Sequence, residues 1–159
     1  MRKKHVIDSD VAPVSHKPIS ADHADQWKIE EHRPGGTITF DPDKILLYRS
    51  VKQRKHGANG IYGHSLRKEL AGQPVLNSTV FEYLMAHPEI IPDSWKGKVI
   101  VFWGTLYRFR DYRPSHLTRG SLCVHCLYWC KNSGGYWEGS CTSLKRFYDS
   151  RDFAPILID

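Results

Sequence analysis

The stretch that decides the fold is VIVFWGTLY, residues 99–107, which is followed by LCVHCLYWC, residues 122–130. The first stretch is apolar at almost every position, so both alternating faces of a strand formed here would be hydrophobic. We predict one face with Val99, Val101, Trp103 and Tyr107, and an opposite face with Ile100, Phe102 and Leu106. A strand of this kind lies inside a sheet that is covered on both sides.

Helical patterns precede this strand. Asn77 is a good N-cap for a helix over 78–86, whose apolar residues recur at helical spacing, and a shorter helix is predicted over 65–70. Further strands are predicted over 37–40, 44–51, 136–144 and 153–158, the last at a sheet edge because it contains Pro155. We therefore predict an α+β fold: a small, mainly antiparallel β-sheet with two short helices packed on one face.

The first 34 residues differ in character from the rest of the chain. They contain three of the nine prolines and four of the nine histidines, and they show no helical or alternating apolar period. We predict a flexible N-terminal tail over 1–34 and a single α+β domain over 35–159.

The net charge of +6 is unevenly distributed. Basic and acidic residues cancel in 1–34, so the whole excess lies in 35–159, which favours polyanionic partners. No apolar run is long enough to span a bilayer, and the basic start is not followed by the apolar stretch of a secretory signal. We expect a cytoplasmic protein that does not enter a membrane.

Three stretches support a resemblance: LRKELAGQPVLNSTVFEYLMAHPEIIPDSWKGK (66–98), VFWGTLYR (101–108) and LCVHCLYW (122–129). In wording and order they resemble a family of short uncharacterised bacterial proteins with the pattern PVLN, HP, IPxxWKGK, FWGTxYR and VxCLYW. The resemblance covers about residues 44–158 and implies domain boundaries, but no assigned activity. The chain departs from the family in its extended basic segment 109–120 and in three cysteines, Cys123, Cys130 and Cys141, whereas Cys126 fits the pattern.

The cysteine spacing at first suggests zinc. In a strand, however, Cys126 and Cys130 share one face while Cys123 and His125 share the other, so four ligands converge only if residues 121–130 form a loop. A two-residue turn at Ser133-Gly134 would place Cys126 directly opposite Cys141, where a cross-strand disulfide is conceivable. We favour small buried hydrophobic thiols, leave their redox state open, and predict no metal and no cofactor.

The sequence lacks the usual motifs of enzymes. It contains no Gly-x-Ser-x-Gly elbow, no phosphate-binding glycine loop and no His-Glu-x-x-His, and carboxylates are sparse after Asp93. We therefore expect a binding protein, with a small enzyme that uses Cys126 or a histidine as nucleophile or base as one alternative.

Aromatic residues are concentrated in the second half, where thirteen of the nineteen lie between Trp95 and Phe153. Rings beside arginines suit single-stranded nucleic acid, because bases stack on the rings and cations follow the phosphates. The predicted phosphate contacts are Arg108, Arg110, Arg113, Arg119, Lys131, Lys145 and Arg146. The predicted stacking residues are Tyr107, Phe109, Tyr112, Trp129 and Tyr136. The other alternative is a protein–protein adaptor that uses the same surface to bind an acidic protein partner.

Overall fold

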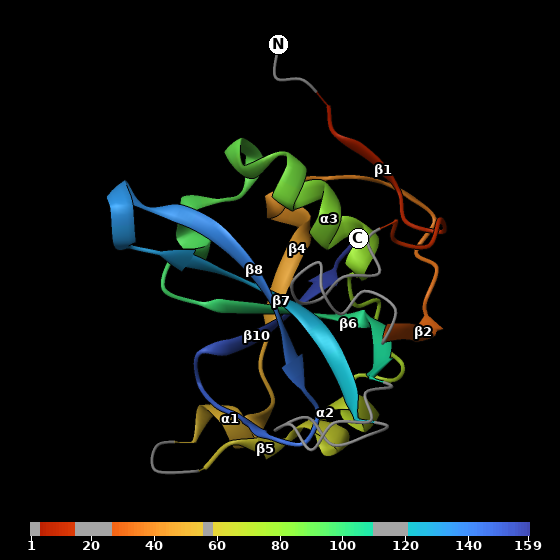
Figure 1. Ribbon diagram of the computed structural model, residues 1–159, viewed down its shortest axis with the longest axis vertical. Coiled ribbons are helices and arrows are strands. Elements are labelled where there is room, and N and C mark those ends of the chain that lie inside the picture. Colours follow the sequence, from red (N-terminus) through yellow and green to blue (C-terminus); the bar gives the residue numbers. More distant parts are fainter. Residues whose placement is uncertain (1–3, 15–26, 56–58, 110–120) are drawn as a thin grey trace.

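The computed structural model describes residues 4–14, 27–55, 59–109 and 121–159 (Figure 1). The strands are β1 (Val6–Asp8), β2 (Trp27–His32), β3 (Thr37–Thr39), β4 (Ile45–Tyr48), β5 (Ile61–Tyr62), β6 (Val99–Phe109), β7 (Leu122–Cys130), β8 (Tyr136–Ser143), β9 (Phe147–Tyr148) and β10 (Asp152–Leu157). The α-helices are α1 (Val51–Arg54), α2 (Gly63–Glu69) and α3 (Ser78–Ala86), with 3₁₀ turns η2 (Pro42–Lys44), η3 (Pro88–Ile90), η4 (Asp93–Trp95) and η5 (Asn132–Gly134). The α+β class is confirmed, although the structure contains more helices and sheets than predicted.

The main sheet has the strand order β4-β10-β6-β7-β8, and β2 pairs with the second half of β6. Strands β6, β7 and β8 form an antiparallel meander, whereas β10 runs parallel to the start of β6. Two small sheets, β1-β3 and β5-β9, flank it. Strand β6 therefore has neighbours on both edges, as its apolar sequence predicted.

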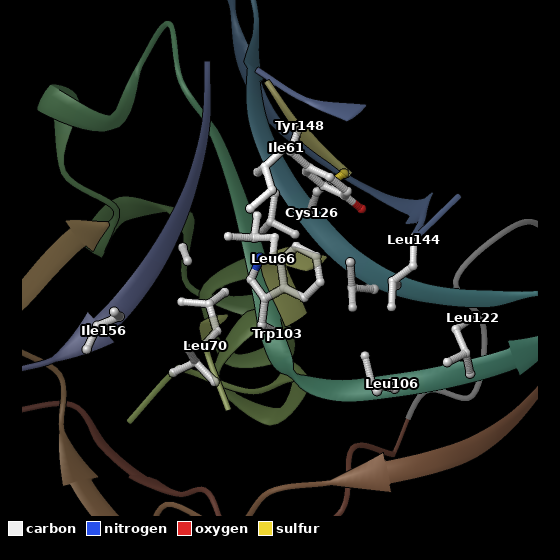
Figure 2. Close-up of a cluster of buried hydrophobic side chains, with 14 residues drawn as sticks. Ile61, Leu66, Leu70, Trp103, Leu106, Leu122, Cys126, Leu144, Tyr148 and Ile156 are labelled. Atoms are coloured by element: carbon white, nitrogen blue, oxygen red, sulfur yellow. The ribbon is translucent and has the colours of Figure 1, made fainter. Parts of the chain in front are cut away.

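The two predicted helices cover opposite faces of the sheet rather than one face. Leu66 and Leu70 of the α2 segment pack with Val101 and Trp103 in one cluster, which Figure 2 shows. Helix α3 packs on the other side, in a cluster that contains Val80, Phe81, Leu84, Ile100, Phe102 and Leu127. The prediction of a single helical face was wrong because β6 is apolar on both faces and each face requires a cover.

A register shift in β6 exchanges two of its predicted side-chain positions. Phe102 pairs with His125, and the next recorded pair is Tyr107 with Cys123. Between these two pairs β6 therefore contains more residues than β7. Leu106 therefore lies with Val101 and not with Phe102. A bulge of this kind reverses the side-chain alternation beyond it.

The N-terminal residues that the structure describes belong to the folded domain. Strand β1 pairs with β3, and β2 pairs with β6 from Trp27 to His32. Ile7 and Trp27 are buried, so these segments bury apolar side chains despite their lack of period. The predicted tail over 1–34 is corrected for residues 4–14 and 27–34, while 15–26 lie outside the described residues.

Strand β10 is internal, although Pro155 led us to predict an edge. Pairing with β6 covers only Asp152 and Phe153, whereas pairing with β4 continues through Pro155. Pro155 therefore lies beyond the residues of β10 that pair with β6. Its missing N–H removes no hydrogen bond between these two strands, so β10 can be an internal strand.

Helix α3 begins where the sequence predicted. The Asn77 side chain accepts hydrogen bonds from the N–H groups of Thr79 and Val80. The predicted strand over 44–51 is shorter, because Ser50 and Gln53 form a capping box that starts α1.

In the part of the chain that the structure describes, no helix is long and apolar enough to cross a bilayer.

Candidate nucleic-acid interface

The sequence-predicted binding residues fall at two ends of the β7–β8 hairpin rather than at one site. Trp129, Lys131 and Tyr136 lie at the turn, where Cys130 pairs with Tyr136. Arg108 pairs with Leu122 at the opposite end of β7, about 25 Å away by the rise of a strand. Lys145 and Arg146 follow the end of β8. Four other predicted residues lie outside the described residues: Arg110, Tyr112, Arg113 and Arg119.

At the turn, the aromatic rings contact each other and a lysine. Trp129 and Trp137 pack edge to face with centroids 5.3 Å apart, and the Lys96 ammonium lies 4.0 Å over the Trp129 ring. The same ammonium lies 2.7 Å from a carboxylate oxygen of Asp93. Trp129 is therefore partly buried and its ring is covered by Trp137 and Lys96, whereas Tyr136 is 46% exposed.

At the opposite end, two of the predicted arginines are held in ion pairs. The Arg108 Nε lies 3.0 Å from a Glu30 carboxylate oxygen across the β2–β6 pair. Arg146 donates two bonds to the Asp152 carboxylate at 2.9 and 3.2 Å, and its guanidinium lies 3.9 Å from the centroid of the Tyr148 ring. Arg146 therefore has a structural role in this geometry. Tyr107, predicted as a stacking residue, is fully buried.

A more exposed aromatic group lies beside Lys145. Phe147 of β9 is 57% exposed and Tyr62 of β5 is 37% exposed, and their ring centroids lie 5.7 Å apart. The His64 ring continues the group, 5.6 Å from the Tyr62 ring. We call these three side chains, together with Lys145, the Tyr62–Phe147 patch.

The backbone brings these rings together from distant parts of the chain. Tyr62 pairs with Phe147 in the β5–β9 sheet, and the Gly63 N–H donates to the Arg146 carbonyl at 2.9 Å. A Cβ at Gly63 would lie 2.3 Å from the Leu144 carbonyl oxygen, so only glycine permits this close approach. The sequence analysis missed Tyr62, His64 and Phe147. The isolated pattern IYGH at 61–64 contains the first two, whereas Phe147 lies in the separate stretch RFY at 146–148.

The electrostatic surroundings of His64 show that the patch is basic. Partial burial lowers the pKa of this imidazole, and the positive charges of Arg67, Lys145 and Lys68 lower it further. At neutral pH the ring is therefore uncharged, and it offers an aromatic face in a positive field. Stacking rings beside cations are the groups that contact a single nucleic-acid strand.

The hairpin register corrects the predicted position of the cysteines. Cys126 faces Ser140 and Cys141 faces His125, so Cys126 and Cys141 lie on opposite faces of the hairpin. The predicted two-residue turn was wrong, because η5 and Gly135 lengthen the connection. All four thiols are free. Burial raises the pKa of Cys126 to about 11, which opposes its use as a nucleophile.

A buried polar chain lies beneath α3. The His125 Nδ1 lies 2.8 Å from the Ser78 hydroxyl, and the Ser78 N–H donates to the Thr105 hydroxyl. The Thr105 hydroxyl in turn bonds His32 of β2. His125 stacks on Phe81, and burial lowers its pKa to about 4. Ser78 and His125 are nearly inaccessible, so this pair joins α3 to the sheet and the N-terminal segment.

Among residues 4–14, 27–55, 59–109 and 121–159, no cluster of three or more His, Cys, Asp or Glu side chains could hold a metal ion.

No family model, curated protein or solved structure matches the chain. The resemblance to short bacterial proteins therefore stays a prediction, and the functional argument rests on the geometry of the patch.

Proposed function

We propose that the protein binds single-stranded nucleic acid without catalysis, and that bases stack on the Tyr62–Phe147 patch. The observation that supports this most directly is the exposure of two adjacent rings on paired strands. A folded protein usually buries such rings, so an exposed aromatic group beside cations indicates a contact surface. Each π-face accepts any base, which suits binding with little sequence preference.

The charge around the patch supports a polyanionic partner. Lys145 is exposed two residues before Phe147, and Lys68 and Arg67 lie on the adjacent helix α2. All three act on His64 with a positive field. A strand whose bases stack on Tyr62 and Phe147 would place its phosphates within reach of this field, and binding would release counterions.

The experiment measures the anisotropy of labelled single-stranded RNA and DNA pools at 50 and 200 mM salt. Phe147→Ala and Tyr62→Ala should each weaken binding by about 5- to 150-fold, since one stacked base contributes ~1–3 kcal/mol. Lys145→Ala should weaken binding and also flatten its salt dependence.

The hairpin turn offers matched controls. Tyr136 is another exposed tyrosine and Lys131 another exposed lysine, both at the distant end of β7–β8. Tyr136→Ala and Lys131→Ala should leave the affinity within about twofold, the size expected for the loss of a remote surface group. Loss of binding in these variants, with Phe147→Ala unaffected, would move the site to the turn.

The result that would refute nucleic-acid binding is the absence of an anisotropy change at 50 mM salt. The adaptor hypothesis would then account better for the exposed Phe147, which also suits the apolar centre of a protein interface. Binding to a protein partner depends less steeply on salt than binding to phosphates does.

A further inference from the structure

A basic pocket opens next to the Tyr62–Phe147 patch. Its volume is about 320 Å³, and its wall includes the same His64 ring that continues the aromatic group. The pocket is lined by Glu31, Arg33, His64, Arg67, Lys68 and Ala71. His64 therefore belongs both to the stacking surface and to the pocket.

The cations of the pocket differ in how far they are already engaged. The Arg33 guanidinium donates to the carbonyls of Leu70, Ala71 and Gln73 and thereby closes the end of the α2 segment. Arg67 uses one terminal nitrogen, which lies 2.7 Å from a Glu31 carboxylate oxygen. Lys68 is exposed and forms no ion pair within the described residues. Arg67 and Lys68 therefore retain donors for a ligand.

Glu31 fixes the arrangement without neutralising it. Its two carboxylate oxygens contact Arg33 at 3.4 Å and Arg67 at 2.7 Å. One carboxylate among three cations leaves two net positive charges on the wall of the pocket. A phosphate monoester carries ≈ −1.5 to −2 charges at pH 7, whereas a phosphodiester within a strand carries only one.

We infer that this pocket binds the terminal phosphate of a single strand whose bases stack on the Tyr62–Phe147 patch. The inference rests on the proposed function and specifies its ligand as a phosphorylated strand end. Arg67 supplies a planar fork that matches phosphate oxygens, and Lys68 supplies a point charge beside it. The His64 ring lies between the base-stacking rings and the phosphate.

The test compares three oligonucleotides of one sequence with an internal label: one with a 5′-phosphate, one with a 3′-phosphate and one with hydroxyls at both ends. One of the phosphorylated strands should bind the wild-type protein about tenfold or more tightly than the hydroxyl strand, as a charge-assisted contact provides. Which end gains affinity identifies the polarity of the bound strand.

Arg67→Gln combined with Lys68→Gln should reduce the ratio between phosphorylated and hydroxyl strands to about one. The matched control is Lys52→Gln combined with Arg54→Gln, which removes the same charges from the exposed side of helix α1. The control should weaken all three strands equally and keep the ratio.

Equal binding of all three strands to the wild-type protein would overturn the inference and leave the proposed function in place. If none of the three strands binds, both the proposed function and the inference are overturned. Because this comparison uses only the wild-type protein, it does not depend on whether a variant folds. A ratio that survives the α2 double variant would also overturn the assignment to this pocket.

Discussion

Acid should destabilise the protein through His125, and the structure gives the magnitude. The imidazole is 2% exposed, and burial lowers its pKa from 6.5 to about 4. Between these values the unfolded chain binds a proton that the folded protein does not, so stability is complete above pH 6.5 and falls as the pH falls. Each pKa unit corresponds to ~1.4 kcal/mol, which gives a loss of about 3 kcal/mol at pH 4.

The assay is urea unfolding, followed by tryptophan fluorescence, at several pH values from 7 to 4. His64 also titrates in this range, because the folded state lowers its pKa from the ordinary value of 6.5. The comparison is therefore made with His125→Gln, whose side chain can still bond the Ser78 hydroxyl but does not titrate. The variant should lose ~3 kcal/mol less than the wild type between pH 7 and 4.

Parallel stability curves for the two proteins would refute this reasoning. So would an NMR titration in which the His125 imidazole of the folded protein protonates near its ordinary value of 6.5. Either result would mean that water or a rearrangement stabilises the charged ring beneath α3, and that the ring is less enclosed than its exposure indicates.

Three further predictions concern single sites. Gly135→Ala should lower the melting temperature more than Gly134→Ala, because both have positive φ but only at Gly135 would a Cβ lie 2.3 Å from an indole ring. Asp152→Asn should cost about 2 kcal/mol in urea unfolding, which is less than the ~3–5 kcal/mol of a fully buried pair because the Arg146 side chain is 36% exposed. Cys126 should resist iodoacetamide at pH 7.5 in the folded protein and react in urea, since burial raises the pKa of its thiol to about 11. Equal labelling rates in the two conditions would contradict this.

Sequence patterns predicted those elements of the fold whose boundaries depend on neighbouring residues. Helix α3 begins after Asn77, as the capping pattern indicated, and the strands over 99–107 and 122–130 lie within β6 and β7. In each case the signal lies within a few residues of the element: a side-chain oxygen for the first N–H groups, or an apolar run between turn residues.

The failures have a common physical origin in contacts between distant segments. The β7–β8 register shifted by one residue because Ser133, Gly134 and Gly135 all adopt positive φ, which a two-residue turn does not describe. Trp27 joins the fold because β2 pairs with the end of β6. The sequence around Trp27 has no alternating apolar pattern that would predict this strand. Such pairings depend on tertiary geometry rather than on local propensity.

The candidate site shows the same limit. The sequence contains many aromatic and basic residues after residue 35, but composition does not distinguish rings that pack inside the protein from rings that remain exposed. Tyr107 is fully buried, whereas Phe147 is 57% exposed, although both lie in short aromatic stretches. The difference arises because β6 is covered on both faces, while β9 pairs, among the described residues, only with the two-residue strand β5. A small peripheral sheet cannot bury both of its faces, so its outward rings are available to a ligand, and Phe147 is therefore the first side chain at which nucleic-acid binding should be tested.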